Sequence, residues 1–185
     1  NLASSYRLAR GKTASKQTLS RLLTGKENDM LIYGIDPGYT GAIAIYTTKR
    51  KELIVHDMPI HKGANGKTLI NLHQLLQDLT NVGKQECLAV LERVSAMPGQ
   101  GVTSTFRFGQ GFGHLEMGIA ASGLPLKYIQ PQQWKRYFGL TKDKNQSREL
   151  AMERFPDNAD LFKRKKDDGR AEAALIALYG AEKLI

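Results

Sequence analysis

Two carboxylates stand directly at the ends of apolar runs. Asp36 ends the run 31–35 and is followed at once by Pro37-Gly38, a turn signal. Glu92 ends the run 88–91 and precedes a loop with two glycines. Short apolar runs bounded by turns are typical of buried β-strands, so each acid is expected at the edge of a sheet, where it can face a cleft. A strand-end Asp is also a common turn residue or helix cap, and neither acid defines a site by itself.

Two more acids lie near the C-terminus, in a stretch that predicts a helix. Asp168 and Glu172 are four residues apart, which places them on one helical face. Asp167 is five residues from Glu172 and points elsewhere. Like charges in adjacent turns repel by about 0.2–0.5 kcal/mol, and a cation would offset that repulsion. Alternatively, Asp167 and Asp168 are ordinary acids at a helix N-terminus, where the helix dipole favours them.

These acids converge if the late helix lies beside the strand that ends at Asp36. Oxygen-only ligand sets suit Mg²⁺ or Mn²⁺. Two such ions about 3.5–4 Å apart can activate a water molecule and stabilise the leaving oxygen in phosphodiester hydrolysis. The candidate metal ligands and catalytic residues are Asp36, Glu92, Asp168 and Glu172.

Composition agrees with an anionic partner. The chain of 185 residues has a formal net charge of +9 and a pI near 9.7, which favours nucleic acid, although such a charge can also serve solubility alone. The single Cys87 lies in an apolar run, so it predicts a small core residue and excludes an intrachain disulfide framework and a thiolate-rich zinc site. We expect no membrane span, no signal peptide and a reducing, cytoplasmic location in a phage or bacterial setting, with an organelle as the alternative.

Apolar periodicity predicts an α/β domain. Five strands are expected at residues 31–35, 41–46, 52–58, 88–92 and 126–130. Helices are expected at residues 69–79, 103–122, 132–138 and 147–155, followed by the last helix, which carries Glu172.

The segment before the first of these helices resembles a nucleotide-binding loop only in part. Gly66-Lys67-Thr68 lies between a predicted strand and a predicted helix, as in a P-loop. That motif needs a glycine five positions before Gly66, where His61 stands, so the backbone cannot wrap phosphates and no nucleotide cofactor is predicted. Thr68 is expected to cap the helix, whose leucines at 72, 75, 76 and 79 would form one apolar face.

The predicted helix 103–122 alternates aromatic residues with glycines. Gly109, Gly111 and Gly113 follow no strand, so we expect them to allow close helix packing and not to bind phosphate. Phe106 and Phe108 are alternatively platforms for unpaired bases, which requires that they be exposed.

Residues 1–29 predict a short helical extension that resembles part of a helix-turn-helix. Two short helices would flank a turn at residues 11–14, and basic residues would face phosphates or bases. The alternative is an amphipathic segment that docks on the main domain, residues 30–185. The DNA-binding candidates in this extension are Arg7, Lys16 and Arg21.

Three motifs in this order resemble those of RuvC-type Holliday-junction resolvases, and of their phage and chloroplast branch in particular. They are Gly34-Ile35-Asp36-Pro37-Gly38, Leu91-Glu92, and Lys165-Lys166-Asp167-Asp168-Gly169-Arg170-Ala171-Glu172-Ala173. In that branch the last motif reads Lys-Lys-Asp-His-Gly-Arg-Ala-Glu-Ala. The resemblance covers residues 30–185. It implies an RNase H-like fold with a mixed five-stranded sheet flanked by helices, a homodimer, and symmetric nicking of four-way DNA junctions with a divalent metal.

The resemblance also assigns residue roles. It implies two ions per active site, held by Asp36, Glu92, Asp168 and Glu172. Bacterial members have Asp where the branch has His, but their acids are three residues apart instead of four, which leaves Asp167 open as an alternative to Asp168. The loop after Glu92 would approach the junction centre, with Met97 as a wedge candidate by position. The other predicted DNA contacts are Lys163, Arg164, Lys165, Lys166, Lys135 and Arg136.

Three other functions compete with this interpretation. Asp36-Pro37-Gly38-Tyr39-Thr40 resembles the phosphate motif of actin-like ATPases, and the strand ending at Glu92 resembles a Walker B strand, but actin-like ATPases need a second domain for which the chain has no room. A different RNase H-like, structure-selective nuclease would use the same acids. A DNA-binding module without catalysis would not place acids where phosphates must lie.

Deletion of residues 1–28 should weaken the affinity of the chain for a four-way junction and flatten its salt dependence. For each phosphate that Arg7, Lys16 or Arg21 no longer neutralises, the slope of log K against log salt falls by about 0.9. Mobility-shift titrations at three salt concentrations measure both quantities. Unchanged affinity and slope would assign the extension to packing or to a linker.

Overall fold

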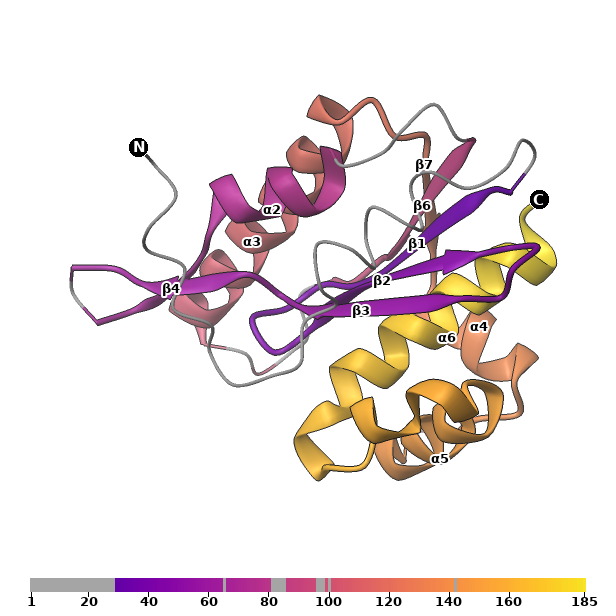
Figure 1. The fold of residues 1–185 in the computed structure, drawn as a ribbon. Helices are drawn as coiled ribbons and strands as arrows, with labels where there is room; N and C mark the ends of the chain where they lie inside the picture. Colours follow the sequence, from indigo (N-terminus) through magenta and orange to yellow (C-terminus); the bar gives the residue numbers. More distant parts are fainter. Residues whose placement is uncertain (1–28, 65, 81–85, 96–98, 100, 142) are drawn as a thin grey trace.

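A computed structural model describes residues 29–185 except 65, 81–85, 96–98, 100 and 142 (Figure 1). The predicted extension therefore lies almost wholly outside the described residues, together with Arg7, Lys16 and Arg21. Met97 also lies outside them. The DNA contacts assigned to these four residues stay predictions.

The centre of the structure is a mixed five-stranded sheet with the order β3-β2-β1-β6-β7. All five predicted strands are present: β1 (Leu31–Asp36), β2 (Ala42–Thr47), β3 (Leu53–Asp57), β6 (Cys87–Glu92) and β7 (Leu126–Ile129). β1, β2 and β3 form an antiparallel meander, whereas β6 and β7 run parallel to β1. The sheet has the arrangement expected of an RNase H-like fold.

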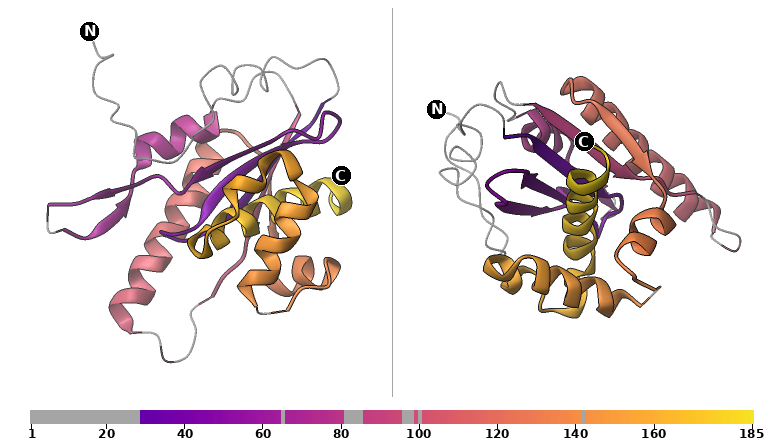
Figure 2. Two further views of the ribbon diagram at one scale, coloured as in Figure 1. Left: turned by 60° about the horizontal axis from the view of Figure 1, so that its bottom comes forward. Right: turned by 90° about the vertical axis from the view of Figure 1, so that its right-hand side faces the viewer.

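Helices cover both faces of the sheet (Figure 2). One face carries α2 (Leu72–Thr80) and α3 (Val102–Ala121). The other carries α4 (Pro131–Tyr137), α5 (Lys144–Arg154) and α6 (Asp168–Lys183), with the 3-10 turns η1 (Pro156–Leu161) and η2 (Lys165–Asp167) before α6. Alternate residues of β1 face the two layers, so that Ile32 lies in the core beneath α6 and Tyr33 in the core beneath α2 and α3.

The helix α6 lies directly against β1 because Gly34 has no side chain. A Cβ at Gly34 would stand 2.2 Å from the carbonyl oxygen of Ala173 and 2.3 Å from the backbone nitrogen of Ala177. Gly180 repeats the arrangement further along the helix, where a Cβ would meet methyl groups of Ile32 and Val90 at 2.8 Å. Glycines on both elements therefore let a helix backbone approach the sheet unusually closely.

The prediction that Thr68 caps a helix starting at residue 69 is wrong. Residues Thr68–Ile70 form the strand β5, which pairs antiparallel with β4 (Ile60–Lys62) in a hairpin that stands out from the domain (Figure 1). Helix α2 begins at Leu72, and the side chain of Asn71 caps it by accepting a hydrogen bond from the backbone N–H of Gln74 (3.1 Å). The residues Leu69 and Ile70 after Thr68 are compatible with a helix or with a strand. Their pairing with β4 determines that this segment is a strand.

The apolar face predicted for α2 is only half present. Leu75 and Leu79 are buried, where they contact the bare backbone of α3 at Gly118. Leu72 and Leu76 are 47% and 38% exposed.

The three glycines of α3 that were predicted to allow close packing are not required for it, since an added Cβ would make at most an ordinary van der Waals contact. A Cβ at Gly111 would lie 3.4 Å from Cδ1 of Ile70, whereas Gly109 and Gly113 face open space. Phe106 is 71% exposed, as the base-stacking alternative requires, whereas Phe108 is half-buried.

Two expectations from composition can be compared with the structure. Cys87 is half-buried at the start of β6, and burial raises the pKa of its thiol to about 11, so the thiol stays protonated. Across the part of the chain that the structure describes, no helix combines the length and the apolar character that a membrane span requires.

Replacement of Gly34 by Ala should lower the free energy of unfolding by about 2–3 kcal/mol or more, because the new methyl group collides with backbone atoms of α6 that have no room to move. Chemical denaturation measures the change. The matched control is Gly109→Ala, on the open face of α3, which should raise stability by about 0.5–1 kcal/mol through helix propensity. Equal effects of the two substitutions would contradict the close contact of α6 with β1.

Candidate metal centre

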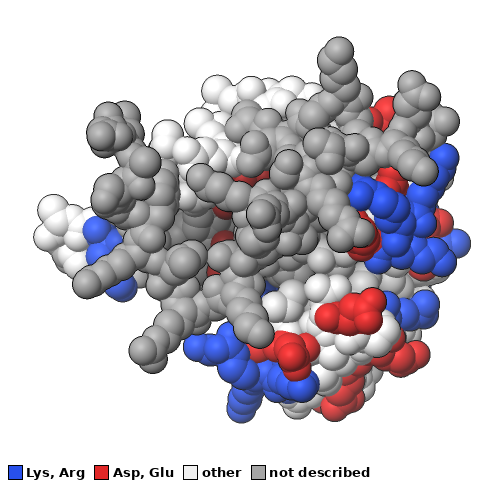
Figure 3. Space-filling view, viewed as in Figure 1, with Lys and Arg blue, Asp and Glu red and all other residues white. Residues whose placement is uncertain are grey.

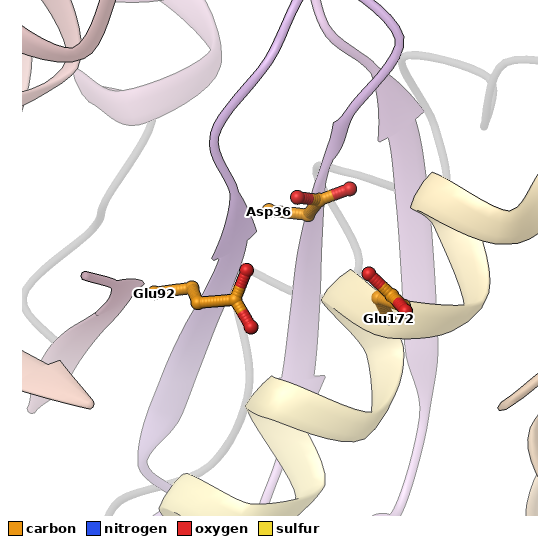
Figure 4. A group of neighbouring side chains, drawn as sticks. All are labelled: Asp36, Glu92 and Glu172. Atoms are coloured by element: carbon orange, nitrogen blue, oxygen red, sulfur yellow. The ribbon is translucent and has the colours of Figure 1, made fainter. Parts of the chain in front are cut away.

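Three of the four predicted carboxylates meet at one end of the sheet (Figure 4). One oxygen from each of Asp36, Glu92 and Glu172 lies within 4.8 Å of the others. Glu92 and Glu172 are 6% and 7% exposed, and Asp36 is half-buried. The group is therefore an acidic pocket that is largely withdrawn from solvent.

Strand register brings the first two acids together. β1 and β6 are parallel neighbours in which Ile35 is opposite Leu91, so Asp36 and Glu92 are the next residues of the two strands. Both follow the same alternation as Gly34 and therefore point to the face that α6 covers. The expectation that apolar strands deliver both acids to one sheet edge is met in this way.

The third acid is placed by the first turns of α6. A Cβ at Gly169 would be 2.4 Å from the carbonyl oxygen of Thr40 and 3.1 Å from Oδ2 of Asp36. Gly169 thus lets the start of α6 lie on the turn between β1 and β2. Glu172 follows three residues later and reaches the two strand-end acids.

Helix α4 holds two of the acids through adjacent side chains. The indole N–H of Trp134 donates a hydrogen bond to Oε1 of Glu92 (2.8 Å), and Trp134 is fully buried. The ammonium of Lys135 donates to Oε1 of Glu172 (2.9 Å) and lies 5.0 Å from the centre of the Trp134 ring. The start of α4 is fixed by Pro131 in its first turn and by Gln133, which accepts the backbone N–H of Gln130 (2.7 Å).

Sequence reasoning missed Trp134 and gave Lys135 a different contact. Nothing in the local sequence distinguishes Trp134 from a core aromatic residue, and only its distance from Glu92 in the fold shows the hydrogen bond. The sequence predicts that Lys135 touches DNA. In the structure its ammonium binds Glu172, with 23% of its side chain exposed, and its contact with DNA stays a prediction.

The fourth predicted ligand, Asp168, lies outside the 4.8 Å group. It is the first residue of α6, half-buried, and is adjacent to Gly169, which touches Asp36.

Its alternative, Asp167, is buried and has other partners. Asp167 accepts the backbone N–H of Arg164 (2.9 Å) and its guanidinium (2.8 Å to Nη2). Burial raises the pKa of Asp167, but the hydrogen bonds from Arg164 outweigh it, and the net pKa is lowered. Asp167 is thus engaged by Arg164, and the role of Asp168 as a metal ligand stays a prediction.

Basic side chains gather around the start of α6, with acids among them (Figure 3). Lys165, Lys166 and Arg136 are exposed. Lys163 pairs with Asp160 (2.5 Å), and Arg164 is half exposed although it binds Asp167. Lys165 and Lys166 directly precede α6, and Arg136 follows Lys135 on α4; the predicted contacts of these cations with DNA stay predictions.

The donor set fits a hard divalent cation. All three converging side chains offer carboxylate oxygens, which Mg²⁺ and Mn²⁺ prefer. Three like charges within one small volume repel one another, and Lys135 supplies a single positive charge against them. A divalent ion bound there would neutralise the remaining negative charge.

Comparison with known proteins supports the fold. No protein-family model matches the chain, and no curated protein matches it by sequence. The structure of Thermus thermophilus RuvC aligns with a TM-score of 0.53 and 15% identity over 82% of this chain and 95% of that one. T. thermophilus RuvC in complex with a Holliday junction substrate aligns with a TM-score of 0.49 and 14% identity over 82% and 92%. The chain has a RuvC-type, RNase H-like fold.

Replacement of Trp134 by Phe should weaken Mn²⁺ binding about 10-fold, because Glu92 loses the donor that orients it. Isothermal titration calorimetry of the metal-free protein measures the dissociation constant. Tyr137→Phe is the matched control on the same helix, since it removes an exposed hydrogen bond to Glu182 (2.9 Å) and should leave Mn²⁺ affinity unchanged. Equal affinities in the two variants would show that Trp134 does not orient a metal ligand.

Proposed function

We propose that this chain is a metal-dependent endodeoxyribonuclease that resolves four-way DNA junctions by paired, symmetric nicks. The single observation that carries the proposal is the convergence of Asp36, Glu92 and Glu172 at the point where α6 crosses the strand ends. The fold alone does not give an activity, because one fold hosts many functions. The acids are an independent support, since metal-dependent hydrolysis of a phosphodiester requires them and packing of the sheet does not.

The proposed site divides its work among the chain's own residues. Asp36, Glu92, Asp168 and Glu172 would hold two Mg²⁺ or Mn²⁺ ions, which when bound supply an activated water and stabilisation of the leaving oxygen. Trp134 fixes the carboxylate of Glu92 by its hydrogen bond.

Lys135 holds Glu172 and offsets part of the negative charge before an ion enters. The exposed cations beside α6 would attract the DNA backbone and hold a phosphate against the acids.

A four-way junction carries two equivalent strands to cut, which favours a symmetric homodimer. The face of α3 that points to solvent suits this partner. Every exposed residue of α3 is uncharged, including Phe106 and Met117, which are 71% and 68% exposed. Gly109 and Gly113 on the same face would let a second helix approach. In a chain with a net charge of +9, we infer that this face meets a second copy and not DNA.

A labelled four-way junction in Mg²⁺ should be nicked at symmetric positions, with linear duplex of the same sequence left intact. The substitutions Asp36→Asn, Glu92→Gln, Asp168→Asn and Glu172→Gln should each lower the nicking rate about 100-fold or more, equivalent to about 2.7 kcal/mol of transition-state stabilisation, while the junction is still bound. Denaturing gels measure the rate, and mobility shifts measure binding. Glu153→Gln, an exposed acid on α5, is the control and should cut like the wild type.

The other outcomes discriminate between functions. Equal cutting of linear duplex would replace the junction resolvase by another RNase H-like nuclease. Binding without cutting by the wild-type protein would support a non-catalytic DNA-binding protein. A supercoiled plasmid with an extruded cruciform reports the dimer, because two sites acting in one complex linearise it without an accumulated nicked form.

A further inference from the structure

An arginine on the first turn of α6 is bound on the side away from the acidic pocket. Arg170 lies between Asp168 and Glu172 in sequence, and its side chain is 13% exposed. Its Nε and Nη2 bind Oδ1 and Oδ2 of Asp57 at 2.5 and 2.6 Å. This is a two-point contact between a planar guanidinium and a carboxylate, which fixes orientation as well as distance.

Arg170 is also part of a longer chain of charges. Its Nη1 lies 3.7 Å from Oδ1 of Asp167, and Asp167 in turn binds Arg164. Asp57 is the last residue of β3, and Asp167 is the last residue of η2. Hydrogen bonds to Asp57 raise the pKa of Arg170, so the cation persists at any working pH. The chain of charges ties three elements together where α6 begins.

This point of attachment is where α6 meets the proposed metal ligands. Gly169, next to Arg170, lies against Thr40 and Asp36. The residue after Asp57 is fastened to the same turn, since the backbone N–H of Met58 donates to the carbonyl of Gly41 (3.0 Å). Arg170 therefore connects the start of α6 to the β1–β2 turn through β3.

The acidic pocket creates a need for such an attachment. Asp36, Glu92 and Glu172 are brought within 4.8 Å, with Asp168 one turn away on the same helix. Without a cation, their mutual repulsion pushes the first turn of α6 away from the sheet. Lys135 binds Glu172 from α4, at a position one turn further along α6 than Asp168.

We propose that Arg170, together with Asp57, is a positioning residue that holds the first turn of α6 in the geometry needed to bind the metal ions. It touches neither the ions nor DNA, and acts by fixing where Asp168 and Glu172 stand. The inference rests on the metal site of the proposed function.

An ion pair remote from the acidic pocket would give a different result, and the chain contains one for comparison. Arg50 Nε binds Oδ2 of Asp29 at 2.7 Å. Asp29 precedes β1 and Arg50 lies in the β2–β3 turn, so this pair is at the end of the sheet opposite Asp36. Its removal should lower stability without affecting the acidic pocket.

The test measures Mn²⁺ binding by calorimetry on metal-free protein without DNA, with thermal melting of the same samples. Arg170→Met should raise the Mn²⁺ dissociation constant about 10-fold. Asp57→Ala should raise it by a similar factor, and the double variant should be no worse than Arg170→Met alone, because both substitutions break the same ion pair. Arg170→Lys should restore little, since an ammonium cannot bind both oxygens of Asp57 in the same plane. Arg50→Met should lower the melting temperature and leave the dissociation constant unchanged.

An unchanged Mn²⁺ dissociation constant in both Arg170→Met and Asp57→Ala would overturn the inference. If Arg170→Met does not fold, Asp57→Ala decides alone, because the side chain of Asp57 is 63% exposed and its removal leaves no cavity. Wild-type junction nicking with unchanged Mn²⁺ affinity in the variants would reject the positioning role and keep the proposed function. If the variants bind Mn²⁺ more weakly than the wild type does, but the wild type cuts no junction, the positioning role is supported and the proposed function is rejected.

Discussion

The close contact between α6 and β1 is the constraint on which the rest of the structure depends. A helix packed on a sheet through ordinary side chains would hold Glu172 too far from the strand ends to join Asp36. At Gly34 a single methyl group would already overlap the helix backbone, at 2.2 Å from a carbonyl oxygen. Gly169 likewise lets the start of the helix approach the β1–β2 turn closely. The glycines at these contacts, which have no side chains, thus determine the distance between the acidic side chains in the pocket.

Because the acids lie so close together, their negative charges repel one another. Two sets of contacts, one inside the pocket and one outside it, oppose the effect of this repulsion. Trp134 and Lys135 donate hydrogen bonds from α4 to Glu92 and Glu172, inside the pocket. Arg170 binds Asp57 outside it, at the back of the same helical turn. The inner contacts orient carboxylate oxygens and supply one positive charge. The outer contact supplies no charge to the pocket but resists displacement of the helix. Orienting the carboxylates and holding the helix in place are therefore separate functions. The net charge of +9 of the whole chain can perform neither of them.

The sequence predicted the parts of this arrangement that have a local signal. Apolar runs that stop at Asp36 and Glu92 indicated strand ends, and the spacing of Asp168 and Glu172 indicated one helical face. The β4–β5 hairpin was missed because Leu69 and Ile70 suit a strand or a helix equally, and only pairing with Ile60 and His61 decides. The bond from Trp134 to Glu92 joins residues 42 positions apart, so no local pattern contains it. The roles of the acids as metal ligands stay predictions that rest on their convergence.

Asp168 lies one turn before Glu172 on α6, about 6 Å away along the helix axis, and is outside the 4.8 Å group that Glu172 joins. Asp168 is adjacent to Gly169, where an added Cβ would lie 3.1 Å from Oδ2 of Asp36. Asp36 is therefore close both to Glu92 and Glu172 and to the turn that carries Asp168. Two ions about 3.5–4 Å apart need a carboxylate that both can share and ligands on either side of it. We infer that this is why the fourth acid stands apart from the other three and still belongs to the proposed site.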